Sequence, residues 1–117
     1  MKKNKVAFIS GITGMVGSHL ADYIIKNSDW EIVGLIRWRS PLNNISHLLE
    51  SINNNGRIKL VYGDLKDSIS IDKAIEENKP NYVFHLAAQS YPKTSFDAPI
   101  DTFNTNILGT ARLLEVI

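Results

Sequence analysis

Gly11-Ile12-Thr13-Gly14-Met15-Val16-Gly17 joins a short apolar run to a stretch with helical periodicity. The spacing is Gly-x-x-Gly-x-x-Gly. Glycines at these positions permit a tight turn, let a pyrophosphate approach the backbone, and allow a helix to lie close to a strand. The first amide groups and the positive dipole end of the helix then attract phosphate. A tight turn without a ligand is the alternative, but the strand before it and the helix after it favour dinucleotide binding.

On either side of this turn, strand-like runs alternate with helical patterns, which is typical of a parallel α/β sheet. Short apolar runs predict strands over 6–10, 32–36, 58–62 and 82–86. Helical spacing predicts helices over 15–26, 69–78 and from about 100 to 117, and residues 40–56 predict a short helix flanked by loops. We therefore expect one Rossmann-like, doubly wound α/β unit with strand order 3-2-1-4.

The last predicted helix and strand indicate that apolar surfaces of this chain lack partners. An apolar stripe of period 3.6 runs along the helix through Phe103, Ile107, Leu108, Ala111, Leu114 and Ile117. The chain stops inside this helix without a capping residue, so we expect it to be the front portion of a longer protein. Strand 82–86 should then form an open edge, and Leu113, Leu114 and Ile117 should lack their full packing partners.

Composition excludes several classes of function. The chain has 117 residues, of which 44% are hydrophobic, enough for one core. Thirteen basic and twelve acidic residues give a formal net charge of +1, which argues against a nucleic-acid partner. The absence of cysteine excludes disulfides and cysteine-ligated zinc. No run approaches the ~20 apolar residues of a membrane span, so we expect no membrane partner and a cytoplasmic location.

The end of the second predicted strand indicates which dinucleotide binds. An acidic residue there would bond the adenosine ribose of NAD, but the sequence reads Gly34-Leu35-Ile36-Arg37-Trp38-Arg39-Ser40. Two guanidinium groups and a hydroxyl suit a 2′-phosphate instead, which predicts NADP. The alternative is that Arg37 and Arg39 belong to the solvated face of a surface loop.

Two further polar residues allow more than one interpretation. Asp64, at the end of the third strand, could accept a hydrogen bond from the adenine amino group or cap the following turn. His85 lies within an apolar strand, where a hydrogen-bonded core histidine is commoner than a ligand or a base. It has no second histidine or carboxylate at metal-ligand spacing, so we assign no metal.

Four motifs resemble those of the extended short-chain dehydrogenase/reductases, the family of nucleotide-sugar epimerases and dehydratases. They are Gly11-x-x-Gly14-x-x-Gly17, Gly63-Asp64-Leu65, His85-Leu86-Ala87-Ala88-Gln89-Ser90 and Asn106-x-x-Gly109-Thr110. The resemblance covers essentially the whole chain. Within the family, the chain is most similar to the GDP-mannose 4,6-dehydratase group, in Gly11-Ile12-Thr13-Gly14, the arginine-rich end of the second strand, Tyr62-Gly63-Asp64-Leu65 and Ala88-Gln89-Ser90.

The resemblance implies a set of cofactor-binding residues. The NADP site would be lined by Gly11, Thr13, Gly14, Met15, Val16, Gly17, Arg37, Asp64, Leu65, Leu86, Ala87, Ala88, Gln89 and Ser90, with Arg39 and Ser40 completing the 2′-phosphate pocket. Ser90 would also lie near the sugar of the substrate. Members of the family often contact the cofactor with a tyrosine near position 101, where this chain has Asp101.

The resemblance also implies that the catalytic base lies outside these residues. The family uses the tyrosine of a Tyr-x-x-x-Lys motif on the helix after the fifth strand. Tyr62-Gly63-Asp64-Leu65-Lys66 has this spacing, but it leaves a strand for a loop, whereas the motif needs both side chains on one helix face. We therefore assign no catalytic residue, and we interpret residues 1–117 as the N-terminal part of an NADP-binding domain.

The activity that the resemblance implies is that of a lyase. The parent protein would be a nucleotide-sugar 4,6-dehydratase that takes a GDP-sugar, forms a 4-keto-6-deoxy sugar nucleotide and assembles as a homo-oligomer, and the 117 residues alone would be inactive. The alternatives within the family are an epimerase and a 4-keto-sugar reductase. A non-catalytic NADP-sensing module is the alternative from another class.

Overall fold

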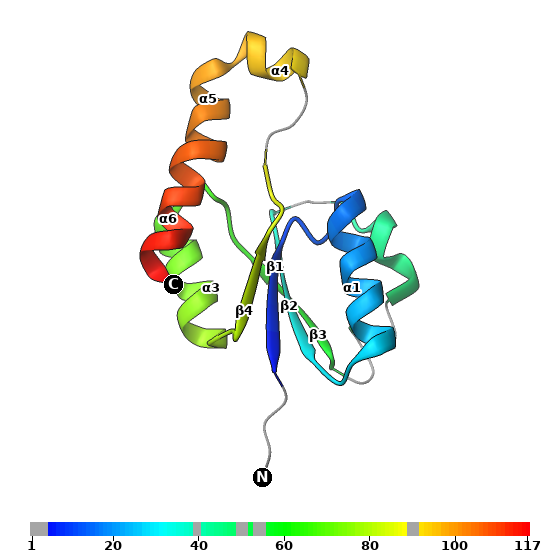
Figure 1. Cartoon of the computed structure of the whole chain (residues 1–117). Coiled ribbons are helices and arrows are strands. Elements are labelled where there is room, and N and C mark those ends of the chain that lie inside the picture. The colour runs from blue at the N-terminus through cyan, green and yellow to red at the C-terminus, as the bar shows by residue number, and fades with distance from the viewer. Residues whose placement is uncertain (1–4, 39–40, 49–51, 53–55, 89–91) are drawn as a thin grey trace.

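The computed structural model describes residues 5–38, 41–48, 52, 56–88 and 92–117. Four strands in these ranges form one parallel sheet in the order β3-β2-β1-β4 (Figure 1). Their bounds are Val6–Ser10 for β1, Glu31–Ile36 for β2, Ile58–Tyr62 for β3 and Tyr82–His85 for β4. The structure therefore confirms the predicted fold class and strand order.

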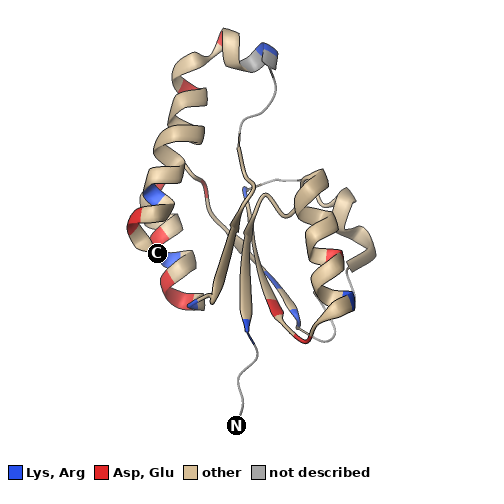
Figure 2. Ribbon diagram, in the orientation of Figure 1, with Lys and Arg blue, Asp and Glu red and all other residues tan. Residues whose placement is uncertain are grey.

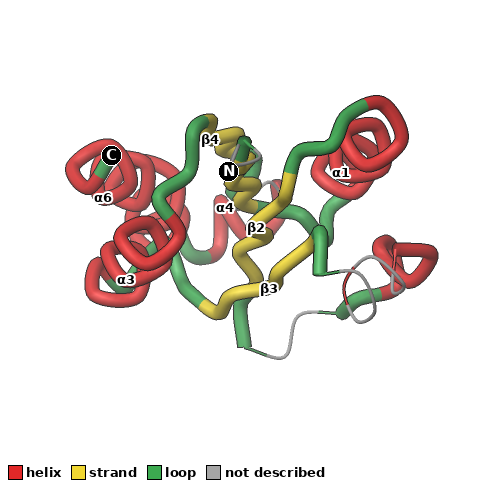
Figure 3. The backbone as a smooth tube through the Cα atoms, turned by 90° about the horizontal axis from the view of Figure 1, so that it is seen from below, coloured by secondary structure: helices red, strands yellow, loops and turns green. Residues whose placement is uncertain are grey.

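Helices cover both faces of the sheet. Figure 3 shows α1 (Met15–Asn27) on one face, and α3 (Ser68–Asn78) with α6 (Gly109–Val116) on the other. Successive residues of β1 accordingly enter different cores, since Phe8 packs beneath α3 and α6 whereas Ile9 belongs to the core that includes Ala21 and Ile24 of α1. Because both faces are covered, the strand is continuously apolar rather than alternating.

The helices predicted over 15–26 and 69–78 are confirmed with small shifts in their ends. α1 continues to Asn27, one residue beyond its expected end. α3 begins at Ser68 because the Asp67 carboxylate caps it, accepting from the backbone N–H groups of Ile69 and Ser70 at 3.0 and 3.3 Å. It ends at Asn78, where the C-cap residue Lys79 has a φ of +43° and is followed by Pro80.

The short helix expected within residues 40–56 is a 3₁₀ helix, η1, over Asn43–Leu48. Its Ile45 and Leu48 side chains are buried in the core on the α1 side of the sheet. The helix is also tied to the glycine-rich turn, because the Asn44 side-chain amide donates to the Thr13 carbonyl at 2.8 Å.

The C-terminal helical region differs from the single helix that the sequence predicts. It contains α4 (Pro92–Asp97), which the sequence analysis missed, then α5 (Pro99–Phe103), a π-helical turn η2 (Asn104–Leu108) and α6. We refer to Pro92–Val116 as the helical arm. The π turn accommodates an extra residue, so the apolar positions after it are rotated relative to those before it.

The apolar side chains of this C-terminal region differ in whether they reach the core. Leu113 is 2% exposed and packs with α3, so the expectation that it lacks its packing partners was wrong. Leu114 and Ile117 are exposed, as expected. Much of the predicted stripe also faces outward, since Phe103 and Ile107 are 56% and 60% exposed. The arm therefore presents apolar side chains to solvent.

The open edge expected at the fourth strand is confirmed, because β4 pairs with β1 alone among the described strands. Neither strand contains Lys, Arg, Asp or Glu, and β4 is tan in Figure 2. An edge without lysine or proline lacks two of the usual defences against pairing with another chain. In the described part of the chain, no helix is long and apolar enough to cross a membrane.

The exposed apolar residues of the arm predict self-association of the 117-residue chain at micromolar concentration. Ile107→Lys should shift sedimentation towards the monomer, because a charge would have to be desolvated in the contact. Ile69→Lys is the matched control, since Ile69 is an isoleucine that is 78% exposed on another helix. A wild-type chain that sediments as a monomer at every concentration would contradict the prediction.

Candidate dinucleotide site

The turn between β1 and α1 meets the loop after β4 at the carboxyl edge of the sheet. Gly11 has a φ of +76°, a conformation that favours glycine. A Cβ atom on Gly11 would lie 2.9 Å from the Ala87 backbone nitrogen, so no other side chain fits between the two segments. The structure thus brings together two of the segments predicted to line the cofactor site.

The other two glycines of the motif have different roles. A Cβ atom on Gly17 would lie only 2.1 Å from the Gly11 carbonyl oxygen, so the first turn of α1 packs directly on the preceding loop. The Gly14 position is exposed, and a Cβ atom there would approach only Gly11 O, at 3.3 Å. Gly14 precedes α1, whose N-terminus has no side-chain cap. Unshielded amide groups beside an open backbone suit a phosphate group.

Met15 and Val16 are the two residues between Gly14 and Gly17, and both side chains face solvent. Their side chains are 75% and 64% exposed at the start of α1. Apolar side chains in the first helical turn gain little by facing water, whereas a bound dinucleotide would cover them. Thr13 is half-buried, and its carbonyl holds Asn44 as described above.

Ser10 connects the end of β1 to the loop after β4. Its hydroxyl oxygen lies 3.0 and 3.1 Å from the backbone nitrogens of Leu86 and Ala87, both of which donate to it. The side chain is fully buried. Sequence analysis did not single out Ser10, although a polar residue at the end of an apolar strand, directly before the glycines, is a usable signal.

His85, at the end of β4, is held by two hydroxyl groups. Its Nδ1 lies 2.7 Å from Ser10 Oγ, and its Nε2 lies 3.0 Å from Thr110 Oγ1 of α6. Burial lowers the pKa of the His85 imidazole below its usual value of 6.5. These contacts show His85 as a hydrogen-bonded, half-buried histidine, and they add Thr110 to the residues that support the site.

The end of β2 lies beside the glycine-rich turn, as the NADP prediction requires. Arg37 and Trp38 follow the strand and are exposed. The Trp38 ring lies 5.5 Å from the ring of Tyr62, the last residue of β3, at an interplanar angle of 56°. The predicted Arg39 and Ser40 lie outside the described residues, as do Gln89 and Ser90 after β4.

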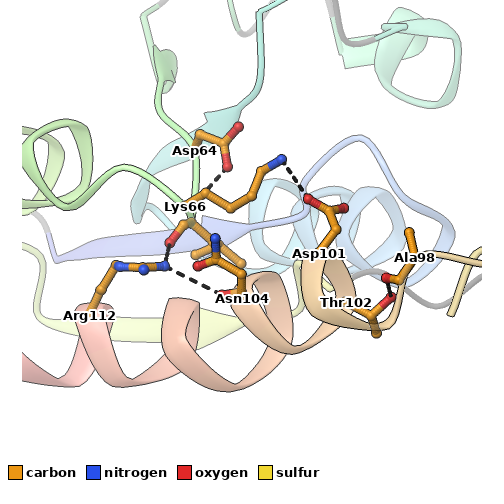
Figure 4. Close-up of polar contacts among 8 residues, drawn as sticks. Asp64, Lys66, Ala98, Asp101, Thr102, Asn104 and Arg112 are labelled. Carbon is orange, nitrogen blue, oxygen red and sulfur yellow. Dashed lines mark hydrogen bonds and ion pairs between the residues drawn. The ribbon is translucent and has the colours of Figure 1, made fainter.

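At the end of β3, the structure favours the second interpretation of Asp64. One carboxylate oxygen of Asp64 accepts from the Lys66 backbone N–H at 2.9 Å and so caps the turn (Figure 4). The Leu65 side chain is 4% exposed and packs in the core between the sheet and α6. Only the backbone of Leu65 is thus left to contact a ligand at this edge.

The same turn is fixed to the helical arm. Lys66 Nζ lies 3.0 Å from a carboxylate oxygen of Asp101, and the two side chains point toward each other in Figure 4. The Arg112 guanidinium donates to the Leu65 carbonyl at 2.8 Å. Tyr62 ends a strand and Lys66 lies in this turn, so the two do not share a helix face. This arrangement supports the rejection of Tyr62 and Lys66 as a catalytic pair. No cluster of three metal-ligating side chains occurs within the described ranges.

The lowered pKa of His85 predicts a pH dependence of stability. In the unfolded chain the pKa of His85 returns to about 6.5. As the pH falls, the unfolded state therefore binds more protons at His85 than the folded state does. The contribution of neutral His85 is therefore complete above pH 6.5 and lost as the pH falls towards the lower folded pKa. Urea unfolding between about pH 8 and 5 should show a smaller loss of stability in His85→Gln than in wild type. His19→Gln, which replaces an exposed histidine of α1, should keep the wild-type dependence.

Comparison with known proteins agrees with this architecture. A family model described as GDP-mannose 4,6 dehydratase matches residues 8–117. The GDP-mannose 4,6 dehydratase of Drosophila melanogaster is 44% identical over 119 residues, which are 98% of this chain and 30% of that protein. The chain therefore spans about a third of the length of the curated relatives it matches.

Solved structures give the same result. The UDP-glucose 4-epimerase of Thermotoga maritima, determined with UDP-glucose, superposes with a TM-score of 0.79 and 26% identity. The UDP-glucose 4-epimerase of Thermus thermophilus, in complex with NAD, superposes with a TM-score of 0.74 and 26% identity. In both cases the match covers 95% of this chain and 33% of the solved chain. With its parallel sheet, its glycine-rich β1–α1 turn and these similarities, the chain belongs to the GDP-mannose 4,6-dehydratase family.

Proposed function

We propose that residues 1–117 are the NADP-binding front portion of a GDP-mannose 4,6-dehydratase, which forms a 4-keto-6-deoxy sugar nucleotide. The observation that carries the proposal is the exposed Gly14 position beside the uncapped N-terminus of α1. A side chain would fill the space that a pyrophosphate needs, and glycine leaves it free. The Thermus thermophilus epimerase in complex with NAD, which shares this fold, supports a nicotinamide dinucleotide as the ligand.

Each part of the dinucleotide has candidate partners in the sequence. The pyrophosphate would bind the backbone N–H groups at the start of α1, with Met15 and Val16 covering its outer side. Arg37, together with Arg39 and Ser40, would bind the adenosine 2′-phosphate through charge-assisted hydrogen bonds. Leu86, Ala87 and Ala88 would border the ribose, where small side chains let the backbone come close. Gln89 and Ser90 would follow, with Ser90 near the sugar.

The adenine would lie between the ends of β2 and β3. The Asp64 carboxylate oxygen that does not cap the turn would accept from its amino group, and the backbone of Leu65 would adjoin the ring. The exposed Trp38 and Tyr62 rings stand at this edge and offer apolar faces for the base.

When bound, the dinucleotide would supply the redox chemistry of the reaction. The residues described here bind and orient that dinucleotide. The tyrosine that removes the proton of the sugar 4-hydroxyl group would lie in a Tyr-x-x-x-Lys motif outside the present chain. The chain alone should consequently bind dinucleotide without converting the sugar.

Turnover of GDP-mannose by the longer protein tests the proposal directly. Formation of a 4-keto-6-deoxy product with NADP added in trace amount would support it, because the cofactor is regenerated in each cycle. Exchange of configuration at C4 without loss of water would indicate an epimerase. Dinucleotide binding without any turnover would favour the sensing module. The 117-residue chain should give no product in the same assay.

Gly14→Val should abolish dinucleotide binding while leaving the fold intact. Its Cβ atom would meet only Gly11 O, at 3.3 Å, so the protein itself requires little adjustment, whereas the branched side chain would occupy the phosphate position. The measurements are calorimetric titration with NADP and circular dichroism.

Gly17→Ala provides the contrasting variant. Its Cβ atom would lie 2.1 Å from backbone, so this substitution should lower the stability itself, by about 1–3 kcal/mol or more. A folded Gly14→Val variant with wild-type affinity would contradict a phosphate site at this turn.

Replacing Arg37 and Arg39 with alanine should weaken NADP binding by about 1.5–3 kcal/mol per charge-assisted hydrogen bond lost. NAD binding should change much less, since NAD lacks the 2′-phosphate. Lys26→Ala, on the exposed last turn of α1, controls for the loss of positive charge. Equal affinities of the wild-type protein for NADP and NAD would rule out the proposed 2′-phosphate pocket.

A further inference from the structure

The hydrogen bonds of the Ser10 hydroxyl group indicate which ring nitrogen of His85 carries the proton. A hydroxyl oxygen has two acceptor positions and one hydrogen. The Leu86 and Ala87 backbone N–H groups both donate to Ser10 Oγ, at 3.0 and 3.1 Å. The third close contact, 2.7 Å to His85 Nδ1, must then use the serine hydrogen. Nδ1 is therefore the unprotonated nitrogen of the ring.

Thr110 fixes the other side of the ring. Its hydroxyl lies 2.7 Å from the Asn106 carbonyl oxygen of the preceding turn, and a carbonyl can only accept. The single threonine hydrogen is used there, so at the 3.0 Å contact with His85 Nε2 the ring nitrogen donates. Both contacts thus require the neutral imidazole with its proton on Nε2.

The charged groups around the ring do not compensate a positive charge there. β1, η2 and residues 86–88 contain no acidic or basic side chain. The charged residues of α3 and α6, the two helices packed on this face, are Asp72, Lys73, Glu76, Glu77, Arg112 and Glu115. Arg112 donates to the Leu65 and Asn104 carbonyls, and the others are exposed. Burial lowers the pKa of the His85 imidazole, which favours its neutral form.

We propose that His85, as the neutral Nε2–H tautomer, is a positioning residue that holds the Leu86–Ala88 loop against the Gly11 turn and couples that loop to α6. The hydrogen bonds run without a break from the Asn106 carbonyl through Thr110, His85 and Ser10 to the two loop amides. The loop is thereby held in the position that a dinucleotide requires. This last step rests on the proposed function, whereas the hydrogen-bond assignment does not.

Protonation of His85 would disrupt this arrangement at Ser10. A proton on Nδ1 would bring a third donor to an oxygen that already accepts two amide hydrogens. One of the two loop amides would have to release Ser10 Oγ. The Leu86 N–H would keep the Ser10 carbonyl, to which it also donates at 3.2 Å, so the Ala87 N–H is the group that would lose its partner. The Leu86–Ala88 loop should loosen over the pH range in which His85 titrates, before the sheet itself unfolds.

Nuclear magnetic resonance on the 117-residue chain tests the assignment without any ligand. At about pH 8, the ¹⁵N shifts of His85 should show an unprotonated Nδ1 and a protonated Nε2. Hydrogen exchange at the Leu86 and Ala87 amides should accelerate about tenfold or more in His85→Phe, while exchange at the buried Phe8 amide changes less. The opposite tautomer, or unchanged exchange in this variant, would overturn the proposal.

Dinucleotide titration in matched variants tests the positioning role. His85→Phe should weaken NADP binding about tenfold or more. His85→Asn keeps an acceptor towards Ser10 but cannot titrate. Its affinity at about pH 8 should stay within about threefold of wild type, and it should not fall as the pH is lowered below 6.5, whereas the affinity of wild type should fall. Thr110→Val should weaken binding and Thr110→Ser should restore it, because serine keeps the hydroxyl group.

The outcomes separate the two proposals. A wild-type protein that binds neither NADP nor NAD would overturn the proposed function, and the tautomer and exchange measurements would still decide the hydrogen-bond assignment. Normal binding by His85→Phe, or an equal pH dependence in His85→Asn and wild type, would overturn the positioning role while leaving the proposed function intact.

Discussion

Three backbone segments of this protein meet where there is no space for a side chain. Gly17 adjoins the Gly11 carbonyl, and Gly11 in turn adjoins the amide of Ala87. This contact fixes the direction in which α1 leaves β1 and brings the loop after β4 to the same place. The open Gly14 position is available only because its two neighbouring glycines are this tightly packed.

Directly beneath this contact, the central strand buries a polar group at modest cost. An unpaired buried hydroxyl would destabilise the sheet, but the Ser10 hydroxyl bonds to two loop amides and the His85 ring. The same bonds satisfy backbone donors where β4 ends and the ladder with β1 stops. Hydrogen bonds between β1 and the chain after β4 therefore continue past the end of the sheet, to Leu86 and Ala87 of the loop.

The sheet, the strand order and the first helix were predictable, because each depends on a local pattern that buried parallel strands and their covering helices impose. The contacts of Ser10 and Thr110 were not predictable, since they join residues far apart in sequence that share no spacing rule. The helical arm differs from its prediction for other reasons. A constant period of 3.6 cannot anticipate the π turn over Asn104–Leu108, and the expectation that Leu113 lacks packing partners overlooked its burial with α3 in the core. The 3₁₀ geometry of Asn43–Leu48 depends on packing against α1 that a run of asparagines does not reveal.

The position of β1 in the middle of the sheet also determines when the protein can fold. Ser10 and His85 are separated by 75 residues, so β1 gains its second neighbour only after most of this chain has been synthesised. Until then β1 and β2 can pair, but one side of the central strand stays open. Parallel pairings of such long sequence separation form slowly. The nascent chain thus carries an apolar, unpaired β1 edge through much of its synthesis, which makes it a substrate for chaperones that bind extended apolar segments.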